Sequence, residues 1–144
     1  MITTNPDKYI RKAIFDLLND IEVSGKTIKC FDSRITGNAK LLNYILLTAQ
    51  TKTIEKANKC EYRWNTSVLI EIFTKTSSQG NAGSRVLLND IEQAVNDLLL
   101  PQIEVDNFDV ITQDLSYNTQ LESVTDTENI YRSFLTLELT LNLK

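Results

Sequence analysis

The end of the chain alternates strictly between leucine and polar residues. Leucine occupies every second position from Leu135 to Leu143, and the residues between them are Thr136, Glu138, Thr140 and Asn142. Because side chains of a β-strand point alternately to two faces, this pattern predicts a strand with one leucine face and one polar face. We expect this strand to be paired inside a sheet and covered by apolar side chains, so that the last residues close the fold.

Two segments have the apolar spacing of amphipathic helices. The first begins with an N-cap at Asn5 and Pro6 in the first helical position and runs to about Asn19 or Asp20. Its apolar stripe comprises Ile10, Ala13, Ile14, Leu17, Leu18 and Ile21. The second runs from Ser84 to Leu100, ahead of Pro101, and its stripe comprises Leu87, Leu88, Ile91, Ala94, Val95, Leu98 and Leu99.

Phe15 lies outside the apolar stripe of the first predicted helix. Its burial in a monomer is therefore not required by the pattern. We expect this ring either to pack under a loop or to contact a neighbouring subunit.

Alternating and β-branched segments predict the remaining strands. After a turn at Ser24 and Gly25, these strands are expected at residues 26–34, 42–53, 61–76, 108–122 and 131–143. The strands at 42–53 and 61–76 form a long hairpin with a charged tip at 55–59. Turn-forming and polar residues predict loops at 36–40, 77–83 and 123–129.

The resulting element order is α-β-β-β-α-β-β, an α+β fold. Hairpin connections favour a mostly antiparallel sheet of four to five strands, with both helices packed on one face to bury their stripes. The opposite sheet face is expected to stay polar. At 144 residues, the chain fits one domain that covers residues 1–144.

Charge and composition restrict the partners. The chain has 15 basic and 19 acidic residues and a net charge of -4, which argues against a surface that wraps nucleic acid. It has no signal-like N-terminus and no run of the roughly 18 apolar residues that a membrane span needs. We therefore expect no membrane partner and synthesis in a cytoplasm. Cys30 and Cys60 favour two reduced thiols over a disulfide or a metal site.

The sequence offers little for catalysis. It contains no histidine, which excludes Ser-His-Asp and Cys-His catalysis and every metal site that uses histidine. Its four glycines match neither a phosphate-binding loop nor a dinucleotide-binding fingerprint. We expect neither enzymatic activity nor a cofactor.

Two charged groups are candidates for binding. The acidic residues could form a carboxylate site for a divalent cation, although their setting in polar loops favours solvated surface charge; they are Asp106, Asp109, Asp126 and Glu128. A basic and aromatic cluster surrounds the hairpin tip and comprises Lys52, Lys56, Lys59, Arg63 and Trp64. Interleaved Glu55 and Glu61 favour an ordinary solvated hairpin tip over a nucleic-acid site.

The whole pattern resembles the tail completion or tail terminator proteins of tailed bacteriophages. The resemblance rests on a helix at 5–19, a long hairpin at 44–76, a Gly/Ser break before the helix at 84–100, and two final strands that end in Tyr131-Arg-Ser-Phe-Leu-Thr-Leu-Glu-Leu. It implies a non-enzymatic virion protein made in the bacterial cytoplasm, located at the head–tail junction or in the tail. It also implies a ring of subunits between the portal or connector and the tail, around a channel through which genomic DNA passes without specific binding.

A ring requires contacts between neighbouring copies and closes only at a fixed rotation. The resemblance implies a hexamer or a dodecamer. The hairpin tip, the loops at 77–83 and 123–129, and the first helix are the expected contact regions. Within them, the candidate interface residues are Phe15, Ile54, Lys56, Lys59, Ser78, Asn81, Thr125 and Glu128.

The alternative hypothesis is a small monomeric module that binds a ligand or nucleic acid on the polar face of the sheet. A binding module is expected to remain a monomer with one ligand pocket. A tail component is expected to form rings or to join them when its neighbours are present.

Overall fold

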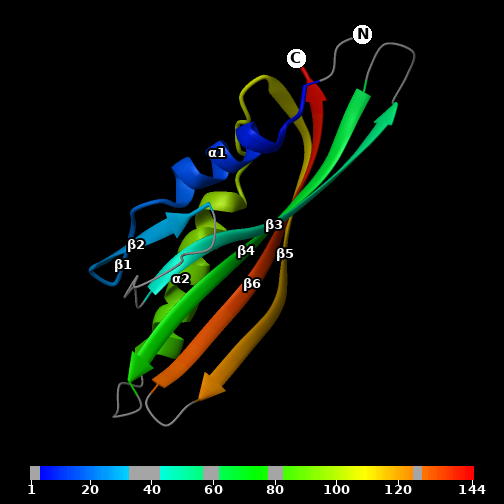
Figure 1. Cartoon of the computed structure of the whole chain (residues 1–144). Helices are drawn as coiled ribbons and strands as arrows, with labels where there is room; N and C mark the ends of the chain where they lie inside the picture. Colours follow the sequence, from blue (N-terminus) through cyan, green and yellow to red (C-terminus); the bar gives the residue numbers. More distant parts are fainter. Residues whose placement is uncertain (1–3, 33–42, 57–61, 78–82, 125–127) are drawn as a thin grey trace.

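A computed structural model describes residues 4–32, 43–56, 62–77, 83–124 and 128–144. It contains two helices that lie on one side of a strongly twisted sheet of six strands (Figure 1). The elements are, in chain order, α1 (Asp7–Leu18), β1 (Ile21–Val23), β2 (Lys26–Phe31), β3 (Asn43–Lys56), β4 (Tyr62–Ser77), α2 (Gly83–Leu99), β5 (Phe108–Val124) and β6 (Glu128–Leu143).

The sheet has the strand order β1-β2-β3-β4-β6-β5. Strands β2 and β3 pair in parallel, whereas all other neighbours pair antiparallel. The α+β class, the mostly antiparallel pairing and the long β3–β4 hairpin are confirmed. The sheet has one strand more than the expected four to five, and the β2–β3 pair was not predicted to be parallel. Side-chain alternation reports which residues share a face, and it carries no information on whether neighbouring strands run in the same direction.

The strand missing from the sequence prediction is β1. The first helix ends at Leu18, so Ile21 belongs to a strand and not to the helical stripe. Asp20 has a φ of 60° and redirects the chain between the two elements. The predicted turn follows at Ser24 and Gly25, whose φ values of 51° and 77° are those of the two-residue turns that join short hairpins.

The start of α1 lies one residue later than predicted. Pro6, and not Asn5, is the N-cap, and its carbonyl accepts a hydrogen bond from Ile10 N at 3.0 Å. Oδ1 of Asn5 accepts a hydrogen bond from the backbone N of Asp7 at 3.0 Å, so Asn5 still satisfies a free amide at the start of the helix.

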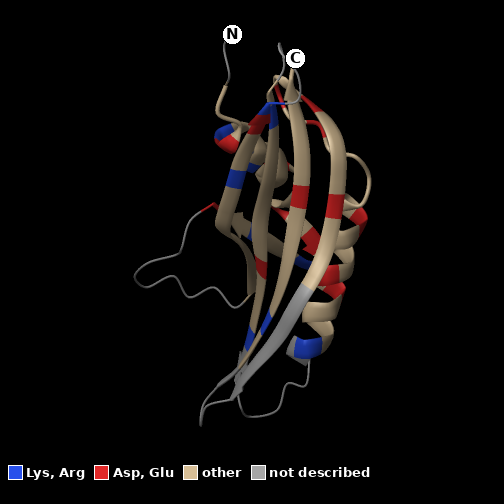
Figure 2. Ribbon diagram, turned by 90° about the vertical axis from the view of Figure 1, so that its right-hand side faces the viewer, with Lys and Arg blue, Asp and Glu red and all other residues tan. Residues whose placement is uncertain are grey.

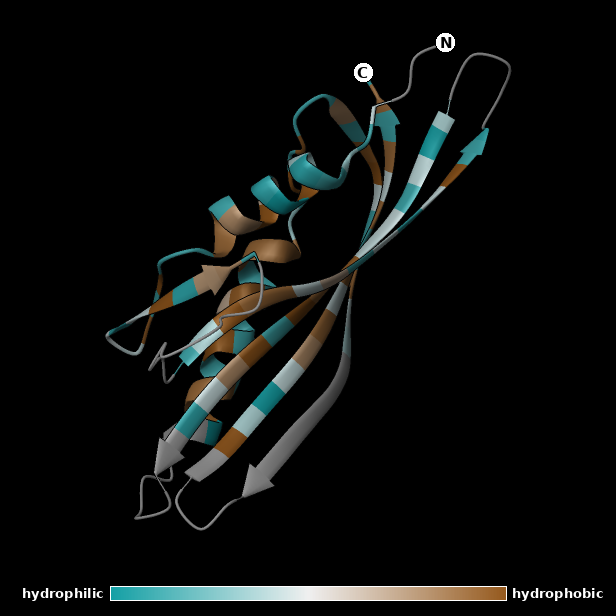
Figure 3. Ribbon diagram, viewed as in Figure 1, coloured by the Kyte–Doolittle hydropathy of each residue, from teal (hydrophilic) through white to brown (hydrophobic). Residues whose placement is uncertain are grey.

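Both helices pack on the same face of the sheet, and their buried residues form one core with the leucine ladder. Leu135, Leu137, Leu139 and Leu141 are at most 2% exposed, whereas Leu143 is 36% exposed at the end of the strand. The alternation of apolar and polar positions along β6 is visible in Figure 3. Within the described residues, no helix is long and apolar enough to cross a membrane.

Candidate assembly interface

The sheet face opposite the helices carries a shallow polar groove. It has a volume of about 350 Å³ and crosses β3, β4, β6 and β5. Hydroxyl groups are bonded across the strands: Thr51 Oγ1 lies 2.5 Å from Ser67 Oγ, and Thr112 Oγ1 donates to Thr140 Oγ1 at 2.7 Å. These pairs hold the polar side chains in fixed positions and leave a hydrogen-bonding surface toward solvent.

Two carboxylates lie side by side in this groove. Asp114 of β5 and Glu138 of β6 are register partners, and both are exposed. Like charges directly opposite one another destabilise a sheet. The two carboxylates also give this part of the face a negative potential, which disfavours the binding of nucleic-acid phosphates.

The same face is not polar throughout, contrary to the sequence prediction. Phe31, Tyr44 and Phe73 form an aromatic cluster, with the rings of Tyr44 and Phe73 stacked at 4.6 Å between centroids. The Arg132 guanidinium lies 5.5 Å from the Phe73 ring, and its Nε is 3.4 Å from Oε1 of Glu71. A second, smaller apolar group thus supports the sheet on the side without helices.

The β3–β4 hairpin extends past α1 at one end of the molecule (Figure 1). Ile54 is 45% exposed there, and Lys56 is exposed beside it. Lys52 lies 5.9 Å from the Trp64 ring and forms an ion pair with Asp7 at 2.6 Å. The predicted basic and aromatic cluster exists in part, but one of its lysines is neutralised by the start of α1.

Phe15 is partly buried and packs against the core at the edge of a hollow on α1. The hollow has a volume of about 500 Å³ and is otherwise lined by charged residues: Asp7, Lys8, Arg11, Lys12 and Asp32. A contact of Phe15 with a neighbouring subunit stays a prediction.

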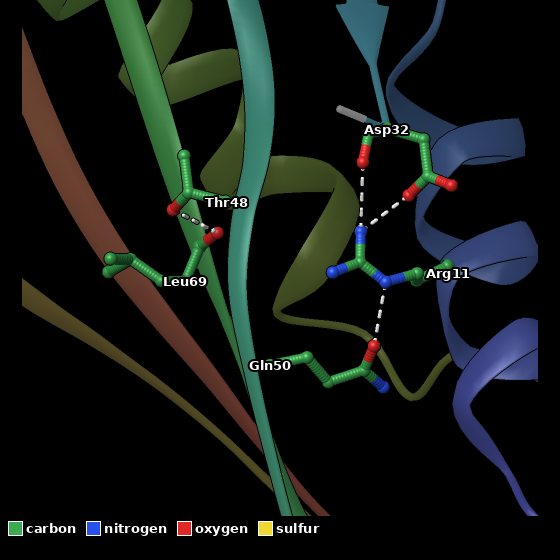
Figure 4. Close-up of polar contacts among 5 residues, drawn as sticks. All are labelled: Arg11, Asp32, Thr48, Gln50 and Leu69. Carbon is green, nitrogen blue, oxygen red and sulfur yellow. Dashed lines mark hydrogen bonds and ion pairs between the residues drawn. The ribbon is translucent and has the colours of Figure 1, made fainter. Parts of the chain in front are cut away.

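Arg11, which lines this hollow, forms hydrogen bonds to two other parts of the fold. Its Nε donates to Oε1 of Gln50 at 2.7 Å, while Nη1 donates to the backbone oxygen of Asp32 at 3.0 Å and pairs with its Oδ1 at 2.6 Å (Figure 4). Gln50 follows a register shift in β3, where Thr48 donates to the carbonyl of Leu69 at 3.3 Å. Arg11 thus ties α1 to the irregular part of β3 and to the end of β2.

A second groove of about 480 Å³ lies between α1 and the connection from α2 to β5. Its apolar residues are Ala13, Leu17, Leu98, Pro101 and Ile103, and its charged residues are Lys12, Asp16, Glu104 and Asp106. A hydrogen bond to Asp16, followed by the charges of Asp16 and Asp106, raises the pKa of Lys12. The groove is therefore apolar at its base and predominantly acidic around it.

Gln113 fixes the connection that forms one wall of this groove. Its Oε1 accepts from Ile103 N at 2.9 Å, and its Nε2 donates to the carbonyls of Leu99 at 2.5 Å and Pro101 at 2.7 Å. Sequence reasoning did not select Gln113, because a single glutamine in a weakly alternating strand has no distinguishing pattern. Its role depends on contacts between residues that are 10 to 14 positions apart.

The remaining predicted interface residues are placed only in part. Lys59, Ser78, Asn81 and Thr125 lie outside the described residues, whereas Glu128 begins β6 and is the register partner of Ser77. Among the described candidates, Glu128 and Ile54 lie at opposite ends of the β4–β6 ladder, because Glu128 pairs with Ser77 whereas Ile54 pairs with Trp64.

Of the four carboxylates considered as a cation site, Asp106 and Asp109 have described side chains. Asp106 and Asp109 are exposed, Asp126 lies outside the described residues, and the described part of the chain contains no group of metal-ligating side chains. Cys30 is buried with a free thiol, and burial followed by the charge of Asp32 raises its pKa to about 12. Cys60 lies outside the described residues.

No protein-family model matches the sequence, and a comparison with curated proteins gives no match. Among solved structures, the chain is similar to a chain of the virion of a native gene transfer agent (GTA) particle. The TM-score is 0.62, and the likeness covers 96% of this chain and 99% of that chain. Sequence identity is 12%, so the comparison shows a shared fold.

Proposed function

We propose that this protein is a structural virion component whose copies form a ring in a bacteriophage head–tail connector or tail terminator. The ring joins the portal or connector to the tail around a DNA channel. The observation that carries the proposal is the fold likeness to a GTA virion chain, because it extends over nearly the whole of both chains. The resemblance of the element order to tail completion and tail terminator proteins supports the more specific assignment.

The surfaces of the molecule suit such a role. A projecting hairpin with an exposed apolar residue, Ile54, offers a contact for a neighbouring copy. The polar groove with Asp114 and Glu138 offers a surface along which DNA passes without being held, because carboxylates repel phosphates. A ring of six or twelve copies uses the first surface at each subunit boundary.

The proposed role is non-enzymatic and requires no cofactor. The chain has no histidine, and three charged residues of α1 are held in ion pairs: Arg11 with Asp32, Lys12 with Asp16, and Asp7 with Lys52. A small binding module on the polar sheet face is the rival. The adjoining carboxylates Asp114 and Glu138 disfavour its nucleic-acid form.

Deletion of the gene in the strain that carries it tests the proposal. We expect electron micrographs of induced cultures to show filled heads and tails that are not joined, or tails of irregular length, with restoration when the gene is supplied in trans. Particles of normal morphology and unchanged transfer of DNA in the deletion strain would contradict the proposal.

A further inference from the structure

The charges of the chain are distributed unevenly along its length. Residues 85–124, which contain most of α2 and all of β5, include eight acidic residues and one arginine, a net charge of -7. Since the whole chain carries -4, the remaining residues carry +3. Figure 2 shows acidic positions gathered over α2 and the adjoining side of the sheet. One lateral side of the molecule is therefore strongly acidic.

The β3–β4 hairpin has the opposite charge. Residues 43–77 contain five basic and three acidic residues, a net charge of +2. At the tip, Lys52, Ile54 and Lys56 are spaced by two and therefore share one face of β3. Lys52 forms an ion pair with Asp7. Ile54 and Lys56 are exposed, so this end of β3 presents an apolar side chain and an ammonium group.

The groove between α1 and the α2–β5 connection has the complementary character. Leu17 and Leu98 contribute to its apolar base, and three carboxylates surround one lysine, so its charged lining sums to -2. Lys12 is already paired with Asp16 at 3.0 Å. Glu104 and Asp106, both exposed, are then the carboxylates that face an incoming cation.

We propose that the outer end of β3 in one copy docks in this groove of a second copy, with Ile54 on the apolar residues of the groove and Lys56 toward Glu104 and Asp106. In Figure 1, the described ends of β3 and β4 and the connection from α2 to β5 lie at the same end of the molecule, with the end of β6 between them. A contact between two different surfaces is heterologous, and it generates a ring when the rotation closes. The inference rests on the proposed function and names the subunit contact of that ring.

Disulfide trapping tests the contact directly. In a Cys60→Ser background, protein carrying Ile54→Cys is mixed with protein carrying Ala13→Cys and oxidised with copper–phenanthroline. The control pairs Ile54→Cys with Ile111→Cys, because Ile111 lies outside the groove on β5 and, at 47% exposed, is more accessible to random collision than the partly buried Ala13. We expect the groove pair to form covalent heterodimer several-fold faster than the control pair. Equal rates for the two pairs overturn the proposal.

A charge exchange provides the second test. Lys56→Glu and Asp106→Lys are each expected to reduce trapping by about tenfold, the effect of losing a close interfacial charge pair, and their combination is expected to restore it. The exchange acts on exposed side chains, so both variants should fold. Absence of restoration in the combined pair contradicts the assignment of Lys56 to this groove.

The same trapping in purified particles separates this inference from the proposed function. Particles that contain the protein without the Ile54–Ala13 cross-link overturn the docking contact alone. A cross-link that forms in free protein, when no particle contains the protein, overturns the virion role alone.

Discussion

Individual side chains on the covered face of the sheet decide whether this chain folds. Leu139 is 2% exposed, lies opposite Thr66 in the β4–β6 pairing and belongs to the core shared with both helices. Its neighbours along β6, Glu138 and Thr140, face the other way and contribute to the polar groove. A change of charge is therefore tolerated at one position and not at the next.

Leu139→Asp is expected to prevent soluble folding. The change removes buried leucine contacts worth about 2–5 kcal/mol and buries a carboxyl group that has no hydrogen-bond partner. Together these costs approach the total stability of a small domain, ~5–15 kcal/mol. Solubility and thermal unfolding measure the outcome. Thr53→Asp, which adds the same group on the exposed face, is the control and should melt near the wild-type temperature. A soluble Leu139→Asp protein with an unchanged transition contradicts the assignment of faces.

Cys30 makes stability depend on pH in the alkaline range. Burial raises the pKa of its thiol from 9.0 to about 12, so the folded state binds the proton more tightly than the unfolded state. The contribution of the neutral Cys30 thiol to the free energy of unfolding is fully present below pH 9 and is lost as the pH rises toward 12. In a Cys60→Ser background, we expect the difference in unfolding free energy between wild-type Cys30 and Cys30→Ala to shrink over this interval. A difference that is constant with pH contradicts a buried neutral thiol.

Gln113 is expected to be the costliest glutamine to remove. In Gln113→Ala, the amide of Ile103 and the carbonyls of Leu99 and Pro101 lose their side-chain partner, with an expected loss of about 1–3 kcal/mol. Urea denaturation measures this change. Gln93→Ala, which breaks only an exposed bond to Asp97, should stay within about 0.5 kcal/mol of wild type. Similar losses for both variants contradict the role of Gln113 in fixing the α2–β5 connection.

At the scale of elements, the outer end of the β3–β4 hairpin differs between its two strands. Trp64 of β4 pairs with Leu141 of β6 and packs against the core, whereas Ile54 and Lys56 of β3 are exposed. Mutations of Ile54 and Lys56 are therefore expected to affect contacts between molecules more than the fold itself.

Deletion of residues 54–59 is expected to leave a folded monomer that fails to assemble. The deletion joins Thr53 to Cys60 and leaves residues 60–64 as a five-residue connection to Asn65, a length common in hairpins. Circular dichroism should be retained, while incorporation into particles is lost. Incorporation at the wild-type level removes the hairpin from the assembly mechanism.

The elements with a regular period could be predicted from the sequence, and the exceptions have physical causes. Both helices, the hairpin and the leucine strand follow from apolar spacing. Strand β1 has three residues, too few for a period to be recognised, and it depends on Asp20 adopting a positive φ. The parallel pairing of β2 and β3 and the aromatic cluster on the open face arise from tertiary neighbours, which alternation along one strand does not specify.

Candidate interface residues could be predicted from the sequence only where a local pattern, such as a hairpin tip, indicates that a side chain is exposed. Ile54 and Lys56 at a hairpin tip were identified in this way and are exposed in the structure. The groove between α1 and the α2–β5 connection was not, because Leu17, Leu98 and Ile103 each look like ordinary core residues. Only the packing of α1 beside that connection leaves them at the base of a hollow.

At the scale of the whole molecule, the fold, the hairpin and the asymmetric charge support one account. A GTA virion chain shares the architecture from end to end, and one side of this molecule is acidic while its projecting hairpin is basic. Such a distribution suits head-to-tail contact between identical copies and predicts that assembly weakens as salt screens the charges.

Cryo-electron microscopy of particles from the strain that carries this gene tests the central claim most directly. The account predicts a closed ring of six or twelve copies at the head–tail junction or the end of the tail. In that ring, the fold should fit the density with each hairpin against the next subunit. Particles with a fully assigned junction and tail that contain no copy of this chain would contradict the account.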